Sequence, residues 1–215
     1  MTEKTDGIYN LTSPVQMVFP ALYEPRKFKA NGKESGDPKY GANFIFDPAS
    51  EDFKAIRALA VKIAKAKWPD RDLHTLKFPF TQGDKLADKR KEAGKSDGEY
   101  QRGKVVIVSR SKFEPRLAVI ANGKLTDLEG DLKTKCKNQF YSGALCYAQL
   151  NFVAYDAVGA NPPGIAAYLN MVFSLNKGER IGGGPSAAEV FKSYVGTVVD
   201  EDPTGGLGVG DEIPF

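Results

Sequence analysis

Apolar and polar residues alternate along two stretches in the second half of the chain. Between residues 144 and 155 the even-numbered positions are apolar or small, and between 166 and 175 the odd-numbered positions are. Alternation with a period of two predicts strands with one buried and one wetter face, and Tyr147 and Tyr168 fall on the wetter faces. The positions expected in the core are Cys146, Ala148, Leu150, Phe152 and Ala154 in the first strand, and Ala167, Leu169, Met171, Phe173 and Leu175 in the second.

Shorter strands are predicted in the first two thirds of the chain. The segments 15–20 and 40–47 are apolar or alternating, and 104–109 is rich in β-branched residues. Residues 116–128 read as two short strands around Asn122-Gly123, a dipeptide that strongly favours a two-residue hairpin turn.

One long helix is expected after the second strand. Ser50 is suited to the N-cap, acidic residues follow it in the first turn, and apolar residues recur at helical spacing until Trp68-Pro69 ends the pattern. The polar, Gly-containing segment 82–103 is expected to be a long exposed loop. Near the end, the capping box Ser186 to Glu189 predicts a short helix through about residue 192.

These elements indicate a mainly β protein. Sequential antiparallel strands of this length fit a small closed or partly open barrel better than a sandwich, here with one long inserted α-helix. Residues 1–195 are expected to form one domain. Residues 196–215 hold five glycines, two prolines and one aromatic residue, and we expect them to be a disordered acidic tail.

Composition excludes several classes of protein. No apolar run approaches the ~20 residues of a membrane helix, and the first ten residues do not resemble a secretory signal. Cys136 and Cys146 lack metal-site spacing and read as free thiols, and a lone His74 makes a zinc site or a His-based triad improbable. The stretch "GERIGGGPS" lacks the lysine of a phosphate-binding loop. We therefore expect no catalytic residues, no metal site and no cofactor.

Charge is distributed unevenly along the chain. Residues 1–195 contain all 30 Lys and Arg and 22 of the 27 Asp and Glu, a net charge of +8, whereas residues 196–215 carry −5. A basic body joined to an acidic tail favours a polyanion as the partner of the body.

Cations and aromatic residues are interleaved in two regions of the body. Lysine and arginine neutralise phosphates and aromatic rings stack on unpaired bases, so this mixture is typical of single-stranded nucleic-acid binding. The alternative is that the charges only solvate loops and the rings only fill the core. Lys133, Lys135 and Lys137 would project on one side of an extended chain. The candidate binding residues are Arg102, Lys104, Arg110, Lys112, Phe113 and Arg116 in the first region, Lys133, Lys135, Lys137, Phe140 and Tyr141 in the second, and Tyr147.

The chain also resembles a known class of protein. Its last five residues, "DEIPF", are similar to the terminal peptide of bacterial single-stranded DNA-binding proteins, an acidic run that ends in Ile-Pro-Phe. The longer body, with its helix after the second strand and the stretches "FYSGALCYAQLNFVAYD" and "GERIGGG", resembles the phage-type single-stranded DNA-binding proteins of T7-like phages.

The resemblance implies an OB-fold that binds single-stranded DNA without sequence preference, without catalysis, in phage DNA replication, recombination and repair. It implies a protein in the cytoplasm of the infected host bacterium, with a homodimer as one expected assembly. It further implies that replication or recombination proteins bind the tail through Asp211, Glu212, Ile213, Pro214 and Phe215. Three alternatives stay open at this point: an RNA-binding OB-fold module, a nuclease or recombination nuclease accessory, and a protein-interaction adaptor.

Overall fold

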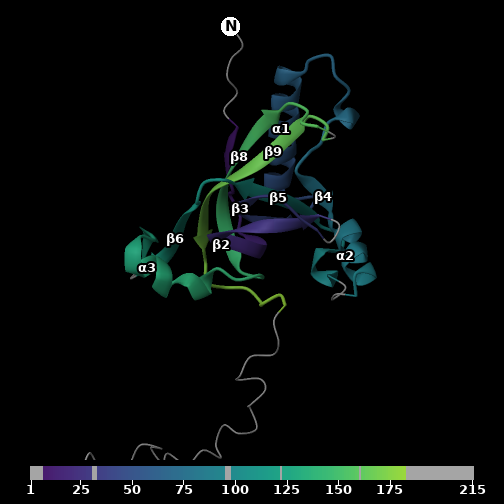
Figure 1. Ribbon diagram of the computed structural model, residues 1–215. Helices are drawn as coiled ribbons and strands as arrows, with labels where there is room; N and C mark the ends of the chain where they lie inside the picture. Colours follow the sequence, from purple (N-terminus) through teal and green to yellow (C-terminus); the bar gives the residue numbers. More distant parts are fainter. Residues whose placement is uncertain (1–6, 31–32, 95–97, 122, 160, 183–215) are drawn as a thin grey trace, which may run out of the picture. The chain divides into compact units, whose positions relative to one another are not determined.

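The computed structural model describes residues 7–30, 33–94, 98–121, 123–159 and 161–182. Five strands form a closed ring in the order β2 (Val15–Ala30), β3 (Lys33–Phe46), β5 (Val105–Ser111), β9 (Gly164–Ser174) and β8 (Leu145–Tyr155), which returns to β2 (Figure 1). Only β5 and β9 are parallel neighbours in this ring. Numbered along the chain, the order is 1-2-3-5-4, the connectivity of an OB-fold. The predicted mainly β barrel is confirmed.

Four short strands extend this ring. β1 (Ile8–Asn10) pairs with β8, and β4 (Phe80–Gln82) pairs with β5. β6 (Arg116–Ala121) runs parallel to β9, and β7 (Lys124–Asp127) pairs back onto β6 as the hairpin predicted around Asn122-Gly123. β5 and β6 therefore lie one after the other along the same strand, β9.

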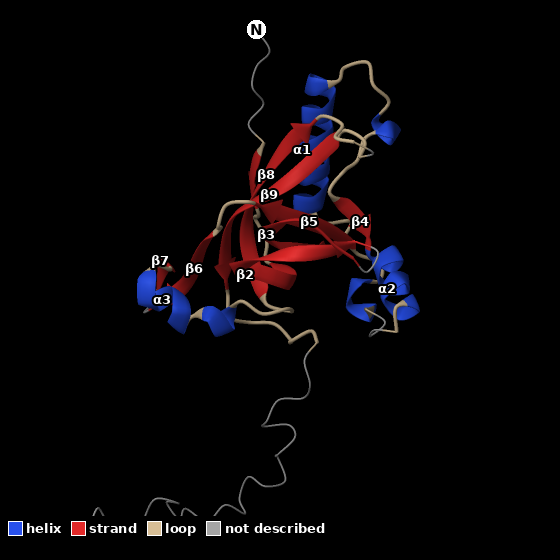
Figure 2. Cartoon of the chain, viewed as in Figure 1, coloured by secondary structure: helices blue, strands red, loops and turns tan. Residues whose placement is uncertain are grey.

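The long inserted helix is confirmed as α1 (Glu51–Lys67). Ser50 Oγ accepts a hydrogen bond from the backbone N–H of Phe53 at 3.3 Å, and Trp68 is the C-cap. Its buried face carries Phe53, Ile56, Ala60, Ile63 and Ala64 and joins the main core beside β8 and β9. Helices occupy the periphery of the strands in Figure 2. In the described part of the chain no helix is long and apolar enough to cross a membrane.

The segment expected to be a long exposed loop instead contains α2 (Gly83–Glu92) and the 3-10 helix Glu99–Gln101, so that expectation is wrong. These elements cover Val18, Ile45 and Val106 on the outside of the barrel, where a second small core forms with Leu86 and Tyr100. A few apolar residues were enough to dock a helix because the barrel offered an apolar patch to cover. α2 also has Asp84 in its first turn and three cations in its last turn, as the helix dipole favours.

The lysines expected to alternate in an extended chain lie in helical structure. α3 (Gly130–Lys135) contains Lys133 and Lys135, and the 3-10 helix Lys137–Gln139 follows it. The expectation of an extended segment is therefore wrong. The three lysines do not project on one side, because residues two apart in a helix point in different directions.

A β-bulge in β9 changes which residues face the core. Gln149 pairs with Met171 but Leu150 pairs with Leu169, which leaves Asn170 as an extra residue. Up to Leu169 the predicted alternation is confirmed. After the bulge it reverses: Val172 and Ser174 are buried, whereas Met171 and Phe173 are only half-buried, as is Leu175 after the strand.

The other predicted strands agree with the structure in position, although β2 and β3 are much longer than predicted. The short strands β1 and β4 were not predicted. In β8 the predicted core positions are buried, except for half-buried Ala154. The predicted helix at 186–192, the end of the predicted domain at 195 and the acidic tail lie outside the described residues.

Candidate nucleic-acid interface

Two adjoining hollows on the outside of the barrel share Lys39 and Tyr168, and together we name them the groove. One has a volume of about 490 Å³ and the other about 390 Å³. The groove residues able to meet a polyanion or a base are the cations Lys39, Lys77, Arg110 and Lys112 and the aromatic residues Phe78, Phe113, Tyr155 and Tyr168.

Strands β3, β5 and β9 bring three of these side chains together. Lys39 lies two residues before Gly41, which pairs with Arg110 across β3 and β5. Ser109 pairs with Ala167 across β5 and β9, which places Tyr168 next to Arg110 in register. Because side chains alternate along a strand, Ala167 and Leu169 point into the core and Tyr168, 38% exposed, points out.

The Arg110 side chain is held by carbonyl oxygens of β3 and β5. Its Nη1 donates hydrogen bonds to the carbonyl oxygens of Ser109 at 2.7 Å and Ala42 at 3.3 Å. Burial lowers the pKa of Arg110 to about 10. The guanidinium therefore keeps its positive charge at neutral pH, in a fixed position on the floor of the groove.

Phe113 projects from the connection between β5 and β6. Its ring is 83% exposed, while its backbone N–H donates to Ser111 Oγ at 3.0 Å. An exposed aromatic ring on an anchored backbone contributes little to the core and is available for stacking.

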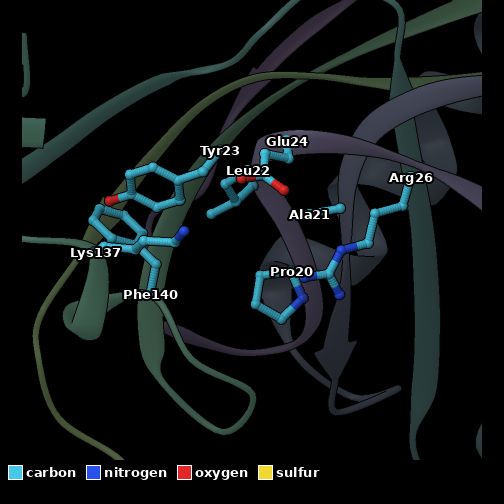
Figure 3. A pocket seen from close by; sticks show the side chains of 8 residues that line it. All are labelled: Pro20, Ala21, Leu22, Tyr23, Glu24, Arg26, Lys137 and Phe140. Carbon is cyan, nitrogen blue, oxygen red and sulfur yellow. The ribbon is translucent and has the colours of Figure 1, made fainter. Parts of the chain in front are cut away.

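A second basic and aromatic region surrounds a pocket beside β2, where Tyr23, Lys137 and Phe140 lie close together (Figure 3). Lys133 and Lys137 lie over the ring of Tyr23, with Nζ 5.8 and 5.5 Å from its centroid. Phe140 meets the same ring edge-on at 6.1 Å, and burial raises the pKa of Tyr23 to about 12. Phe140 itself is only 7% exposed and belongs to the core, so we do not place it among the residues that contact DNA.

The other candidates from the sequence are dispersed. Arg102 pairs with Asp88 and Glu99, Lys104 with Asp47, and Arg116 with Asp127. Tyr141 donates a hydrogen bond to the Gly178 carbonyl at 2.8 Å and lies 4.1 Å beneath the Arg180 guanidinium, and Tyr147 stacks on Phe173. Lys135 is exposed on α3.

Of the candidate residues, the groove therefore unites Arg110, Lys112 and Phe113. It adds Lys39, Lys77 and Tyr155, which were not proposed, and Tyr168, whose place on a wetter strand face was the available signal. Nothing in the local sequence distinguishes Lys39 or Lys77 from other exposed lysines. Among the described residues, no group of three or more His, Cys, Asp or Glu side chains could hold a metal ion.

The chain is similar to known single-stranded DNA-binding proteins. The family model described as the single-stranded DNA-binding protein of Enterobacter phage Enc34 matches residues 10–203. The structure of the Enc34 protein in complex with single-stranded DNA superimposes with a TM-score of 0.58 at 19% identity, over 82% of this chain and 90% of that one. A second structure of the Enc34 protein superimposes with a TM-score of 0.59 at 18% identity, over 87% of this chain and 90% of that one.

A single-stranded DNA-binding protein encoded by bacteriophage T7 gives a TM-score of 0.48 at 12% identity, over 92% of this chain and 97% of that one. A comparison with curated proteins found no match. No enzyme family is indicated. The family match spans most of the chain and confirms the resemblance to phage-type proteins, so the chain belongs to the Enc34 family of single-stranded DNA-binding proteins.

Proposed function

We propose that the groove binds single-stranded DNA with little sequence preference. The observation that carries this proposal is the union of exposed rings and cations on one outer face of a closed OB-type barrel, with Phe113 and Tyr168 beside Lys39, Arg110 and Lys112. The fold and the family support the same assignment.

Two forces would hold the strand. The cations neutralise phosphates and release their counterions, which makes affinity fall with salt. The rings stack on bases that are unpaired in a single strand, at roughly 1–3 kcal/mol per base, and every base offers a π-face. Both interactions tolerate any sequence, and neither requires a catalytic group or a cofactor.

Fluorescence anisotropy of a labelled oligo-dT at several salt concentrations tests this function. We expect the logarithm of the binding constant to fall linearly with the logarithm of the salt concentration, with a slope of about −0.7 for each neutralised phosphate. Binding that does not depend on salt would contradict the electrostatic part, and no binding would favour a protein-interaction adaptor. Competition with an oligo-rU of the same length separates a DNA-binding protein from an RNA-binding one.

We further propose that the protein acts in phage DNA replication, recombination and repair in the cytoplasm of the host. Its tail, 196–215, carries −5 and ends in Ile213, Pro214 and Phe215. Such a peptide suits an apolar pocket rimmed by cations on a replication or recombination protein, and it can also compete with DNA for the basic body.

Truncation after Val195 tests both roles of the tail. Tighter oligo-dT binding by the truncated chain would support competition. Unchanged binding would leave the tail as a partner peptide only. Retention of host replication proteins by the full chain, but not by a chain with Phe215→Ala, would support recruitment.

A further inference from the structure

A third hollow lies on the outer face of the barrel, beyond the groove. It has a volume of about 230 Å³, is bordered by β2, β3, α2 and the 3-10 helix Glu99–Gln101, and we name it the α2 hollow. The residues that matter in its wall are Phe19, Asn43, Lys89, Arg90 and Gln101.

The α2 hollow continues the face on which the groove lies. Lys39, Gly41 and Asn43 alternate with half-buried Tyr40 and buried Ala42 and therefore share the outer face of β3. At about 3.3 Å per residue, Asn43 is about 13 Å from Lys39. Arg110 lies between them, because it pairs with Gly41. A DNA strand bound in the groove can therefore pass Arg110 and reach the α2 hollow.

Two polar atoms in the wall have no protein partner. Asn43 Oδ1 and Gln101 Nε2 are both buried and unpaired among the described residues, and Gln101 is only 1% exposed. Burying an acceptor and a donor without partners is costly, and native proteins rarely keep such groups without a reason. An acceptor and a donor in one small hollow are what the edge of a nucleobase requires.

Phe19 supplies a flat surface at the same place. Its ring is 42% exposed, and the Arg90 guanidinium lies 5.3 Å from the ring centroid. Its backbone has φ of 53°, a left-handed conformation that is unfavourable for a bulky residue, and its N–H donates to Ser142 Oγ at 2.8 Å. Strain of this kind at an exposed aromatic residue points to function.

We propose that the α2 hollow is a nucleobase subsite for the DNA strand held in the groove. One base stacks on Phe19, its polar edge meets Asn43 Oδ1 and Gln101 Nε2, and Lys89 and Arg90 attract the adjoining phosphates. This subsite rests on the proposed function, because the strand reaches the hollow from the groove.

A single tryptophan placed in the hollow reports stacking directly. The chain has one tryptophan, Trp68, at the end of α1. In a Trp68→Phe background, Phe19→Trp puts the only indole at the hollow. Oligo-dT is expected to quench its fluorescence, while an abasic oligonucleotide of equal length, which has phosphates but no bases, is not.

A second variant measures the contribution to affinity. Phe19→Gly suits the positive φ, so the chain should fold with an unchanged unfolding midpoint. We expect oligo-dT binding to weaken about 5- to 150-fold, the range for one stacked base. Phe19→Tyr should bind like the wild type, and so should Leu125→Ala, which removes an exposed apolar side chain on β7 away from the hollow.

The outcomes separate the subsite from the groove. Suppose that anisotropy shows tight binding while the indole is not quenched, or is quenched equally by the abasic strand. In that case, or if Phe19→Gly binds like the wild type, the hollow is not a base site and the groove remains the proposed binding site. If the wild-type chain binds no DNA, the proposed function fails and the subsite fails with it.

Discussion

Gly41 of β3 and Arg110 of β5 are cross-strand partners in contact so close that position 41 has no room for a side chain. A Cβ atom there would lie 2.2 Å from the Ser109 carbonyl oxygen and 3.0 Å from Arg110 Cδ. The missing side chain leaves room for Arg110, whose guanidinium donates hydrogen bonds to the carbonyl oxygens of Ala42 and Ser109. The position of a central cation of the groove thus depends on a glycine of the neighbouring strand.

Gly41→Ala should therefore disturb both the barrel and the groove. We expect a loss of about 1–3 kcal/mol in the free energy of unfolding, the usual cost of forcing extra atoms into a packed site. We also expect weaker oligo-dT binding, because the Arg110 guanidinium moves. Urea unfolding and anisotropy measure the two effects. A variant with wild-type stability and affinity would show that the strands can part without cost.

Replacing the groove rings should affect binding and not folding. Phe113→Ala removes an 83% exposed ring, so the unfolding midpoint should stay unchanged while oligo-dT affinity falls by about 1–3 kcal/mol. Tyr168→Ala should act similarly. The matched control is Leu125→Ala, which removes an exposed apolar side chain on β7 outside the groove. Equal losses in all three variants would point to a general effect of folding.

The lysines of the groove should be visible in the salt dependence. Lys39→Gln or Lys77→Gln is expected to reduce the steepness of the plot of log affinity against log salt by about 0.7, the value for one phosphate contact on a single strand. Lys124→Gln on β7 removes the same charge outside the groove. If Lys124→Gln changes the slope as much as Lys39→Gln does, the effect reflects the net charge of the protein and not a phosphate contact of Lys39 in the groove.

Local patterns predicted the elements that depend on local rules. The N-cap at Ser50, the end of α1 at Trp68 and the hairpin of β6 and β7 each follow from a few neighbouring residues. The alternation in β8 is confirmed because the bulge in its pairing with β9 places the extra residue, Asn170, in β9 and none in β8.

The errors arose where tertiary packing decided the outcome. Periodicity could not show the extra residue at Asn170, which reverses the faces of β9, because a bulge is defined by the partner strand. The helix α2 forms in a charged segment because Val18, Ile45 and Val106 need a cover. Phe113 and Arg110 were among the candidates because they stand in a dense basic cluster, whereas Lys39 and Lys77 reach the groove only through strand register and folding.

Asp52 links the start of α1 to β1 and to the residues that follow β1. Although 2% exposed, its carboxylate accepts hydrogen bonds from the Tyr9 hydroxyl at 2.8 Å, the Thr12 hydroxyl at 2.8 Å, and the backbone N–H groups of Thr12 and Ser13. Burial alone would raise the pKa of Asp52, but these donors outweigh it, and the pKa lies below its ordinary value. The same contact, after burial, helps to raise the pKa of Tyr9 to about 12.

Asp52→Asn should lower the free energy of unfolding and also make it less dependent on pH in the acid range. An amide would turn an NH₂ group toward backbone donors, at a cost of about 1–3 kcal/mol at neutral pH. Because the folded pKa is depressed, the wild-type carboxylate stabilises fully above the unfolded pKa of about 3.9, and that stabilisation is lost as pH falls through the folded pKa. The difference between wild type and variant in urea unfolding should therefore shrink below about pH 4. Asp70→Asn, at an exposed site, controls for the charge. A difference that is the same at neutral and acid pH would show that the ionised form of Asp52 does not stabilise the fold.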